Sequence, residues 1–310
     1  ILKHSSQTPL CAERLHQAFQ QTGLPPGVFQ YLHLSRDDTR KVILDKRIDF
    51  VAFTGSVAGG HDIHQTVAER FINCGLELGG KDCAFVNKDA NLEFTLDQLV
   101  DGAYFNSGQS CCGIERIYVH QQLFNQFVEA FTARTIQYQL GNPTDSNTNL
   151  GPMVRTSNAD VVRQQIAQAI NAGATPLIDA SQFSANQDES PYLAPQALIN
   201  VNHSMALMRE ENFGPVVGIM PVQDEQHAID LMNDSPYGLT ASIWTNDMEH
   251  AQFIGNKIET GTWFMNRCDY LDPALAWTGV KDTGMGVTLS QLGYNQLTRA
   301  KSYHLRAVPA

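Results

Sequence analysis

The sequence is poor in charge and has no excess of positive charge. Only 17% of its 310 residues are charged, and the formal net charge is −11. Nucleic acids and anionic membranes present phosphate groups that a protein meets with a basic surface. The charge balance therefore argues against both as partners. Small phosphate-bearing molecules are compatible with it, because helix N-termini and loop amides bind phosphate without net positive charge.

Long hydrophobic runs are also missing. No apolar stretch approaches the roughly 20 residues that a membrane-spanning helix needs, and no signal peptide is visible. The first residue is isoleucine and not methionine, and it lies in a run, Ile1–Lys3, with the pattern of a strand. We therefore expect the chain to be truncated at its N-terminus, with any targeting segment lost.

Cysteine is scarce, and its spacing excludes the usual zinc and disulfide frameworks. No two cysteines form a C-x2-C pair, and the one adjacent pair does not suit an ordinary disulfide. We expect reduced thiols, a cytoplasmic location and no metal site. The six cysteines are Cys11, Cys74, Cys83, Cys111, Cys112 and Cys268.

Most of the chain alternates apolar strand patterns with amphipathic helix patterns. This alternation predicts an α/β fold with parallel sheets, and 43% hydrophobic residues are enough to bury a sizeable core. The predicted strands are 28–34, 48–53, 83–86, 116–120, 215–222, 241–245 and 262–266; the predicted helices run from the turn after 56 to about 73 and over 92–104, 123–137, 158–172, 225–232 and 248–258.

Cys111 lies in the first of five short motifs, the segment Asn106–Arg116. It follows a Gly-Gln pair between a predicted helix and a predicted strand, where glycine permits a tight turn. A free thiol has a pKa of ~8.5 and becomes a nucleophile when a local field or a base favours the thiolate. Taken alone, a buried inert cysteine is the commoner interpretation.

Glu77 lies in the second motif, Leu76–Lys81. It stands in an apolar stretch directly before two glycines. Burial raises the pKa of a carboxyl group from ~4.3 toward neutrality, which suits a general base. A glutamate at a strand edge facing water is the alternative, and on this motif alone it is the commoner case.

The other three motifs are glycine-rich or proline-containing turns. Phe53–Gly60 reads as a strand, a turn and a helix start, whose free amides suit a phosphate. Gly55 and Gly60 are five positions apart, so this turn is not the G-x-G-x-x-G fingerprint. Glu210–Pro215 and Trp277–Gly286 are turns when each is taken singly.

Together and in this order, the five motifs resemble the aldehyde dehydrogenase superfamily, from Lys3 to Lys301. The most specific part is the pairing of Glu-Leu-Gly-Gly-Lys with Gly-Gln-x-Cys, 34 positions apart from Glu77 to Cys111. The resemblance implies a partial Rossmann-like nucleotide-binding domain and an α/β catalytic domain with a parallel sheet. It assigns residues 1–77 to the first, 78–290 to the second and 291–310 to a C-terminal segment with an oligomerisation strand.

The resemblance also implies roles for single residues. Cys111 would be the nucleophile, Glu77 would activate the deacylating water, and Trp277 would form an aromatic wall of the substrate pocket. The cofactor would be NAD or NADP. Its binding residues would be Lys3 at the adenosine ribose, Ser6 near the ribose hydroxyls, Gly55, Ser56 and Gly60 around the pyrophosphate, and Glu211 with Phe213 at the nicotinamide ribose.

The chain departs from the family pattern in three places. Ser6 stands where a glutamate favours NAD, so the choice between NAD and NADP stays open. The family's Pro-Phe-Gly-Gly reads Ala276–Gly279, which changes the pocket wall. The asparagine that stabilises the oxyanion lies upstream of Lys3 in the family. An oxyanion donor contributes ~10²–10³ in rate, so we expect the chain alone to be badly impaired.

The implied activity is oxidation of an aldehyde to a carboxylic acid through a cysteine thiohemiacetal and thioester. Lys3-His4 resembles a branch with succinate-semialdehyde substrates. Two alternatives stay open: a CoA-acylating semialdehyde dehydrogenase, against which Glu77 argues, and an inactive truncated homologue. A cysteine hydrolase is a weaker alternative. The resemblance further implies a homodimer or homotetramer, in which the segment 302–308 adds a strand to a neighbouring subunit.

Overall fold

The computed structural model describes residues 1–309. Contacts divide the chain into two compact units: a smaller one of residues 1–53 and 58–74, and a larger one of residues 54–57 and 75 onward. The predicted boundary after Glu77 stays a prediction. No helix of the described residues is long and apolar enough to cross a membrane.

The smaller unit consists mainly of helices. Ser35 caps one of them by accepting a hydrogen bond from the Asp38 amide at 3.1 Å, and Arg40 of that helix pairs with Asp62 of another at 2.6 Å. The first contact stabilises the start of α2, and the second links α2 to α3. Its elements are α1 (Pro9–Gln21), α2 (Arg36–Leu44), α3 (Val57–Ala68) and most of β1 (Phe50–Thr54), and β2 (Asn73–Glu77) begins in it.

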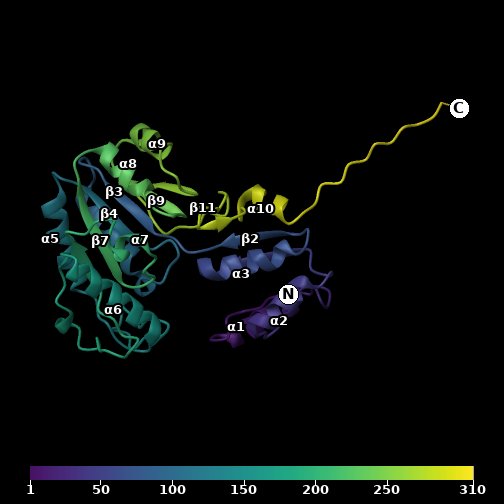
Figure 1. Ribbon diagram of the computed structural model, residues 1–310, viewed down its shortest axis with the longest axis horizontal. Coiled ribbons are helices and arrows are strands. Elements are labelled where there is room, and N and C mark those ends of the chain that lie inside the picture. Colours follow the sequence, from purple (N-terminus) through teal and green to yellow (C-terminus); the bar gives the residue numbers. More distant parts are fainter. Residues whose placement is uncertain (310) are drawn as a thin grey trace. The chain divides into compact units, whose positions relative to one another are not determined.

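The larger unit is built on a seven-stranded sheet of order β10-β9-β3-β4-β7-β6-β5 (Figure 1). All neighbouring strands run parallel except β5, which is antiparallel to β6. The strands are β3 (Asp82–Val86), β4 (Ile114–His120), β5 (Thr175–Pro176), β6 (Gln196–Ile199), β7 (Val216–Val222), β9 (Thr240–Trp244) and β10 (Thr262–Met265).

Helices cover both faces of this sheet. One core contains Ala84, Val119 and the apolar sides of α4 (Leu92–Tyr104) and α5 (Phe124–Thr135). The other core contains Phe85 and Tyr118, the neighbours of those strand residues, with apolar residues of the remaining helices. Alternate residues of one strand thus face opposite layers, as in a sheet buried on both sides. The remaining helices of this layer are α6 (Thr156–Asn171), α7 (Ala206–Arg209), α8 (Glu225–Asn233) and α9 (Met248–Gly255).

Side-chain caps explain where several helices begin. Asn91, Asp224 and Asp247 precede α4, α8 and α9, and each accepts a hydrogen bond from an amide of the first turn. Such a cap satisfies one of the free amides at a helix start. These local signals account for the agreement between predicted and observed starts of the three helices.

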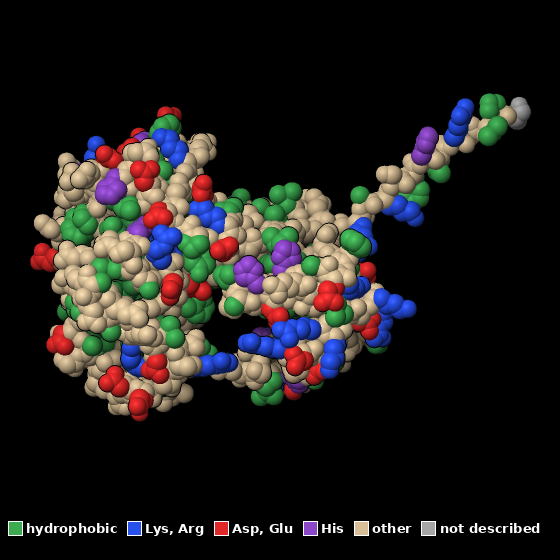
Figure 2. Space-filling model, viewed as in Figure 1, with side chains coloured by type: hydrophobic (Ala, Val, Ile, Leu, Met, Phe, Trp, Pro, Cys, Tyr) green, Lys and Arg blue, Asp and Glu red, His purple; other side chains and the backbone are tan. Residues whose placement is uncertain are grey.

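Short antiparallel strands bring the C-terminal part of the chain to β2. Strand β8 (Tyr237–Gly238) pairs with β11 (Val280–Lys281), and β12 (Gly284–Met285) pairs with the end of β2. The last helix is α10 (Ser290–Gln296), and two 3-10 turns, η1 (Phe105–Gly108) and η2 (Ala180–Gln182), complete the list. From residue 299 to 309 the described chain forms no helix or strand, and its large apolar side chains are exposed (Figure 2).

Parallel sheets were predicted correctly, but two element predictions were wrong. The predicted helix to about residue 73 ends at Ala68, and Asn73–Glu77 is strand β2. The predicted strand 28–34 contributes only a bridge between Tyr31 and Leu2. In both cases strand pairing decides: β2 lies between β1 and β12 in a three-stranded sheet, and 28–34 has only the short bridge to Leu2.

Candidate active site

Left-handed backbone shapes the loop that carries Cys111. Asn106 and Ser107 have φ values of 50° and 59°, and Gly108 follows at 69°. A Cβ atom on Gly108 would collide with the carbonyl group of Gly214, so only glycine fits there. The Ser107 hydroxyl donates to the Gly151 carbonyl at 2.7 Å, which fixes the loop from its other side.

Gln109 of the Gly-Gln pair acts as a clamp. Its Oε1 accepts a hydrogen bond from the Val154 amide at 2.7 Å, and its Nε2 donates to the Asn106 carbonyl at 3.1 Å. The turn that follows closes with Gly113 N donating to Ser110 O at 3.1 Å. The residues around Cys111 are therefore held by contacts with neighbouring loops as well as by the helix before them.

Cys111 is partly buried and packs against Cys112, Leu239 and Trp277. The pKa of its thiol lies below the ordinary value, chiefly because the neighbouring Cys112 thiol can donate a hydrogen bond to it, and against the effects of burial and of the negative charges of Asp269 and Glu77. A lowered pKa increases the thiolate fraction near neutral pH, and the thiolate is the reactive form. The thiol is thus partly accessible and chemically competent.

Glu77 is held at both carboxylate oxygens. Its Oε1 accepts a hydrogen bond from Thr288 Oγ1 at 2.6 Å, and its Oε2 accepts one from Thr54 Oγ1 at 3.3 Å. Thr288 also pairs with Trp277 through two backbone hydrogen bonds of 2.7 and 2.8 Å. Thr288 therefore connects the predicted base, Glu77, to the predicted pocket wall, Trp277. The negative charge of Glu77 also acts on Cys111, where it opposes the lowering of the thiol pKa.

Glu211 lies against the two glycines that follow Glu77. Its Oε1 accepts a hydrogen bond from the Gly80 amide at 3.1 Å. A Cβ on Gly79 would collide with the Glu211 carboxyl, and a Cβ on Gly80 with the Cys111 carbonyl oxygen. Burial, which is the main cause, raises the pKa of Glu211 to about 7. The Gly-Gly pair is therefore the surface on which the Cys111 and Glu211 loops meet.

A buried ion pair holds the loop that carries Glu211 in place. Lys81 Nζ lies 2.6 Å from Glu115 Oε2, and both side chains are almost fully buried, at 0% and 4% exposure. Glu115 also accepts hydrogen bonds from the amides of Asn212 and Phe213, at 2.9 and 2.8 Å. The loop that carries Glu211 is thus fixed to β4, and Phe213 is held at a left-handed φ of 49°.

The structure brings several predicted residues of the larger unit together, among them Glu77 and Gly55, whose amide donates to the Glu77 carbonyl at 3.0 Å. Cys111, Glu77, Glu211 and Trp277 belong to one set of contacts, as described above. The predicted nucleotide residues are spread over both units: Lys3 and Ser6 are exposed in the smaller unit, Gly55 and Ser56 precede α3 in the larger unit, and Gly60 lies in the first turn of α3.

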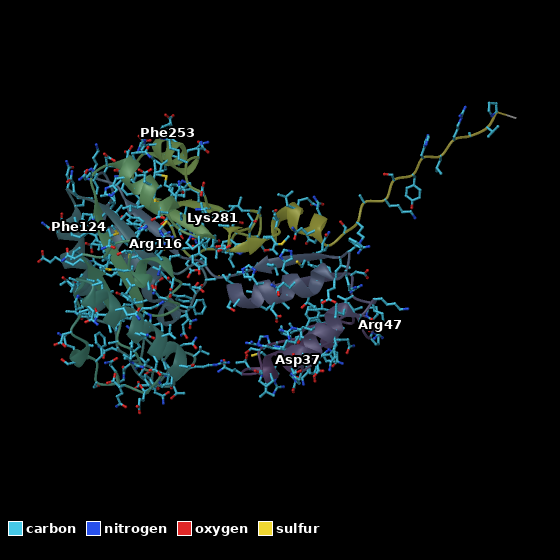
Figure 3. All side chains as sticks on the ribbon, in the orientation of Figure 1. Asp37, Arg47, Arg116, Phe124, Phe253 and Lys281 are labelled. Atoms are coloured by element: carbon cyan, nitrogen blue, oxygen red, sulfur yellow. The ribbon has the colours of Figure 1, made fainter. Side chains whose placement is uncertain are left out.

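Sequence reasoning missed the residues that orient the site. Lys81 lies in the motif of Glu77, and Glu115 lies in the motif of Cys111. Arg116, which follows Glu115, is fully buried (Figure 3), and its guanidinium donates hydrogen bonds to the carbonyls of Lys81 and Leu231. The available signal was three charged residues in or directly before the apolar strands β3 and β4, because buried charges are rarely unpaired. Among residues 1–309, no cluster of three or more His, Cys, Asp or Glu side chains could hold a metal ion.

Glu115→Gln should destabilise the fold strongly. It leaves the buried Lys81 ammonium without its counter-charge, and removing one partner of such a pair costs ~3–5 kcal/mol. Chemical denaturation measures the free energy of unfolding. Asp160→Asn removes an exposed partner of Arg163 and should cost less than about 1 kcal/mol. Equal losses in the two variants would contradict the importance of the buried pair.

Gly80→Ala should also destabilise the protein, by ~1–3 kcal/mol, because its Cβ meets backbone that is packed on all sides. Gly151→Ala is the matched control, since a Cβ there lies at an ordinary 3.6 Å from Pro143. Gly79→Ala should cost less than Gly80→Ala, because the Glu211 side chain can rotate away. Thermal or chemical unfolding of the three variants tests this order.

Comparisons with known proteins agree with one another. The sequence profile of the Aldehyde dehydrogenase family matches residues 1–303. The chain is 35% identical over 296 residues to a succinate semialdehyde dehydrogenase [NAD(P)+] of Escherichia coli, covering 96% of this chain and 63% of that protein. The chain thus spans less than two thirds of that relative's length.

Two solved structures have the same fold. One is succinic semialdehyde dehydrogenase from Streptococcus pyogenes in complex with NADP+, with a TM-score of 0.91 and 31% identity over 100% of this chain and 67% of that one. The other is betaine aldehyde dehydrogenase from Staphylococcus aureus in complex with NAD+, with a TM-score of 0.84 and 30% identity over 91% and 57% of the two chains.

Proposed function

The chain belongs to the aldehyde dehydrogenase family, and on that premise we propose that it carries most of the machinery for oxidising an aldehyde to a carboxylic acid with NAD or NADP. The observation that carries the proposal is the meeting of Cys111, Glu77 and Trp277 around Thr288 and one apolar cluster. A nucleophile and a base so placed suit acyl chemistry on a cysteine.

Each proposed step uses a different property of the two residues. The Cys111 thiolate attacks the aldehyde carbon, so that a C–S bond forms and the carbonyl oxygen takes the negative charge. Loss of hydride from this thiohemiacetal leaves a thioester on Cys111. Glu77 then removes a proton from water, the hydroxide attacks the thioester, and the thiol leaves with the acid released. Bound NAD or NADP would supply the hydride acceptor.

The residues present fit a nicotinamide dinucleotide. The Glu211 carboxyl accepts one amide hydrogen bond and is charged above a pH of about 7, so it retains acceptor capacity for ribose hydroxyls. The α3 helix begins at Val57 and has no acidic residue in its first turn, which suits a pyrophosphate. The proposed contacts are Glu211 and Phe213 at the nicotinamide ribose, Gly55, Ser56 and Gly60 at the pyrophosphate, and Lys3 and Ser6 at the adenosine ribose.

A semialdehyde is the proposed substrate class, supported by the names of relatives that are 35% and 31% identical. NAD and NADP each occur with a structural neighbour, so both are candidates. The two hydrogen bonds that orient the Glu77 carboxylate favour hydrolysis of the thioester over transfer to CoA. A cytoplasmic location is in keeping with six unpaired cysteines.

In the complete protein, Cys111→Ala should abolish the aldehyde-dependent rise in NAD(P)H absorbance, with succinate semialdehyde and an uncharged aldehyde as substrates. Glu77→Gln should keep a first burst of NAD(P)H but lose ~10²–10⁴-fold in steady-state rate, because the thioester forms and is not hydrolysed. Cys11→Ala, at an exposed cysteine, is the control. An equal rate for Glu77→Gln and the unmodified protein, with CoA required, would identify the CoA-acylating alternative.

A homodimer or homotetramer is the proposed assembly, with residues 302–308 as the strand given to a neighbour. Tyr303 and Leu305 are 73% and 87% exposed, and a segment with such exposed apolar residues can pair with a sheet edge. We expect deletion of 302–310 from the complete protein to lower the mass measured by light scattering. A monomeric complete protein would refute the assembly itself.

A further inference from the structure

Cys112, the neighbour of the proposed nucleophile, is engaged by a residue from a distant loop. Its Sγ donates a hydrogen bond to Asp269 Oδ1 at 2.8 Å, across 157 positions of sequence. Cys112 is only 4% exposed. Asp269 lies in the loop after β10 with a left-handed φ of 45°. A buried thiol on a carboxylate, one position from a reactive cysteine, has no part in the chemistry described so far.

The Cys112 thiol has one hydrogen, and three neighbouring groups can accept it. They are the Asp269 carboxylate at 2.8 Å, the Ser110 hydroxyl at 3.6 Å and the sulfur of Cys111, which packs against Cys112. A single hydrogen is donated fully to only one of them. An S–H donated to a thiolate stabilises the thiolate and makes it less nucleophilic. Withdrawing that hydrogen has the opposite effect on both properties.

We propose that Asp269 is a positioning residue that competes with Cys111 for the Cys112 hydrogen and thereby sets the charge state and reactivity of the nucleophile. This rests on the proposed function only in taking Cys111 as the nucleophile. Cys112 is then a switchable donor, and the loop after β10 is the element that controls it. Cys112 itself makes no bond to substrate.

Other charged groups also act on Cys111, and they are acidic. Glu77 on β2, Asp82 on β3 and Glu211 after α7 interact with it electrostatically. Burial raises the pKa of Asp82 well above its usual range, against two hydrogen bonds from Thr240. Asp269 differs from all three because it also accepts a hydrogen bond from Cys112, the residue beside Cys111.

The test follows the alkylation of Cys111 by iodoacetamide in the reduced complete protein from pH 5 to 10, with modified Cys111 identified by peptide mass spectrometry. Asp269→Gly removes the acceptor and fits the left-handed backbone. Asp269→Asn keeps a weaker, neutral acceptor. Cys112→Ala and Cys112→Ser alter the donor. Asp272→Asn is the matched control, because Asp272 lies in the same loop and only accepts a hydrogen bond from the Ala274 amide.

Asp269→Gly should move the inflection of the alkylation profile to lower pH and raise the rate below the inflection about three- to tenfold, the value of one hydrogen bond. Asp269→Asn should give a smaller change in the same direction, and Asp272→Asn close to none. Cys112→Ala should move the inflection to higher pH. In the Cys112→Ala background, Asp269→Gly should retain only the small effect of removing a charge.

Two results would overturn the proposal. One is an unshifted profile in Asp269→Gly. The other is an equal shift with and without Cys112, which would reduce Asp269 to a distant charge. Near-UV circular dichroism checks that each variant is folded. If Asp269→Gly or Cys112→Ala unfolds the protein, the effect of Asp269→Asn is compared with and without Cys112→Ser instead. Because alkylation requires no aldehyde, its outcome is separate from that of the turnover assay with Cys111→Ala.

Discussion

The arrangement of the site depends on one buried charge pair. A lysine and a glutamate inside a parallel sheet are stable together only when every remaining donor and acceptor has a partner. Glu115 meets this requirement with Lys81 and with the amides of Asn212 and Phe213. Satisfying the carboxylate therefore fixes a loop, and that loop carries Glu211 to the glycines beside Cys111. The need to pair the buried Glu115 carboxylate therefore determines where the loop with Glu211 lies.

The sequence predicts what local chemistry determines. Helix 92–104 has the predicted bounds, because its cap residue Asn91 and its apolar spacing are both local in the sequence. The pairing of Cys111 with Glu77 came from motif order and resemblance. What escaped prediction is decided by pairing partners: β2 is a strand because it lies between β1 and β12, and the partners Lys81 and Glu115 are recognisable only once β3 and β4 lie side by side. No local pattern reports a contact between Cys112 and a carboxylate 157 positions away.

Close backbone approach is the second recurring feature of the site. At Gly79 and Gly80 two loops meet a strand end with no room for a side chain, and at Gly108 the loop that carries Cys111 meets the carbonyl of Gly214. At each of these glycines, two segments of the chain lie closer together than a side chain would allow. The glycines that mark the motifs in the sequence are therefore packing requirements of this particular set of loops, and not merely flexible joints.

The anchoring of Glu77 by Thr288 has a consequence for how the protein comes into being. During synthesis the strand that carries Glu77 and the loop that carries Cys111 leave the ribosome long before residue 288 does. Until then the carboxylate lacks one of the two threonines that orient it, and the wall formed by Trp277 is also absent. A nascent chain therefore contains Cys111 and Glu77 for a long interval before Thr288 can orient the Glu77 carboxylate, and the arrangement of these residues is reached only when the fold is nearly complete.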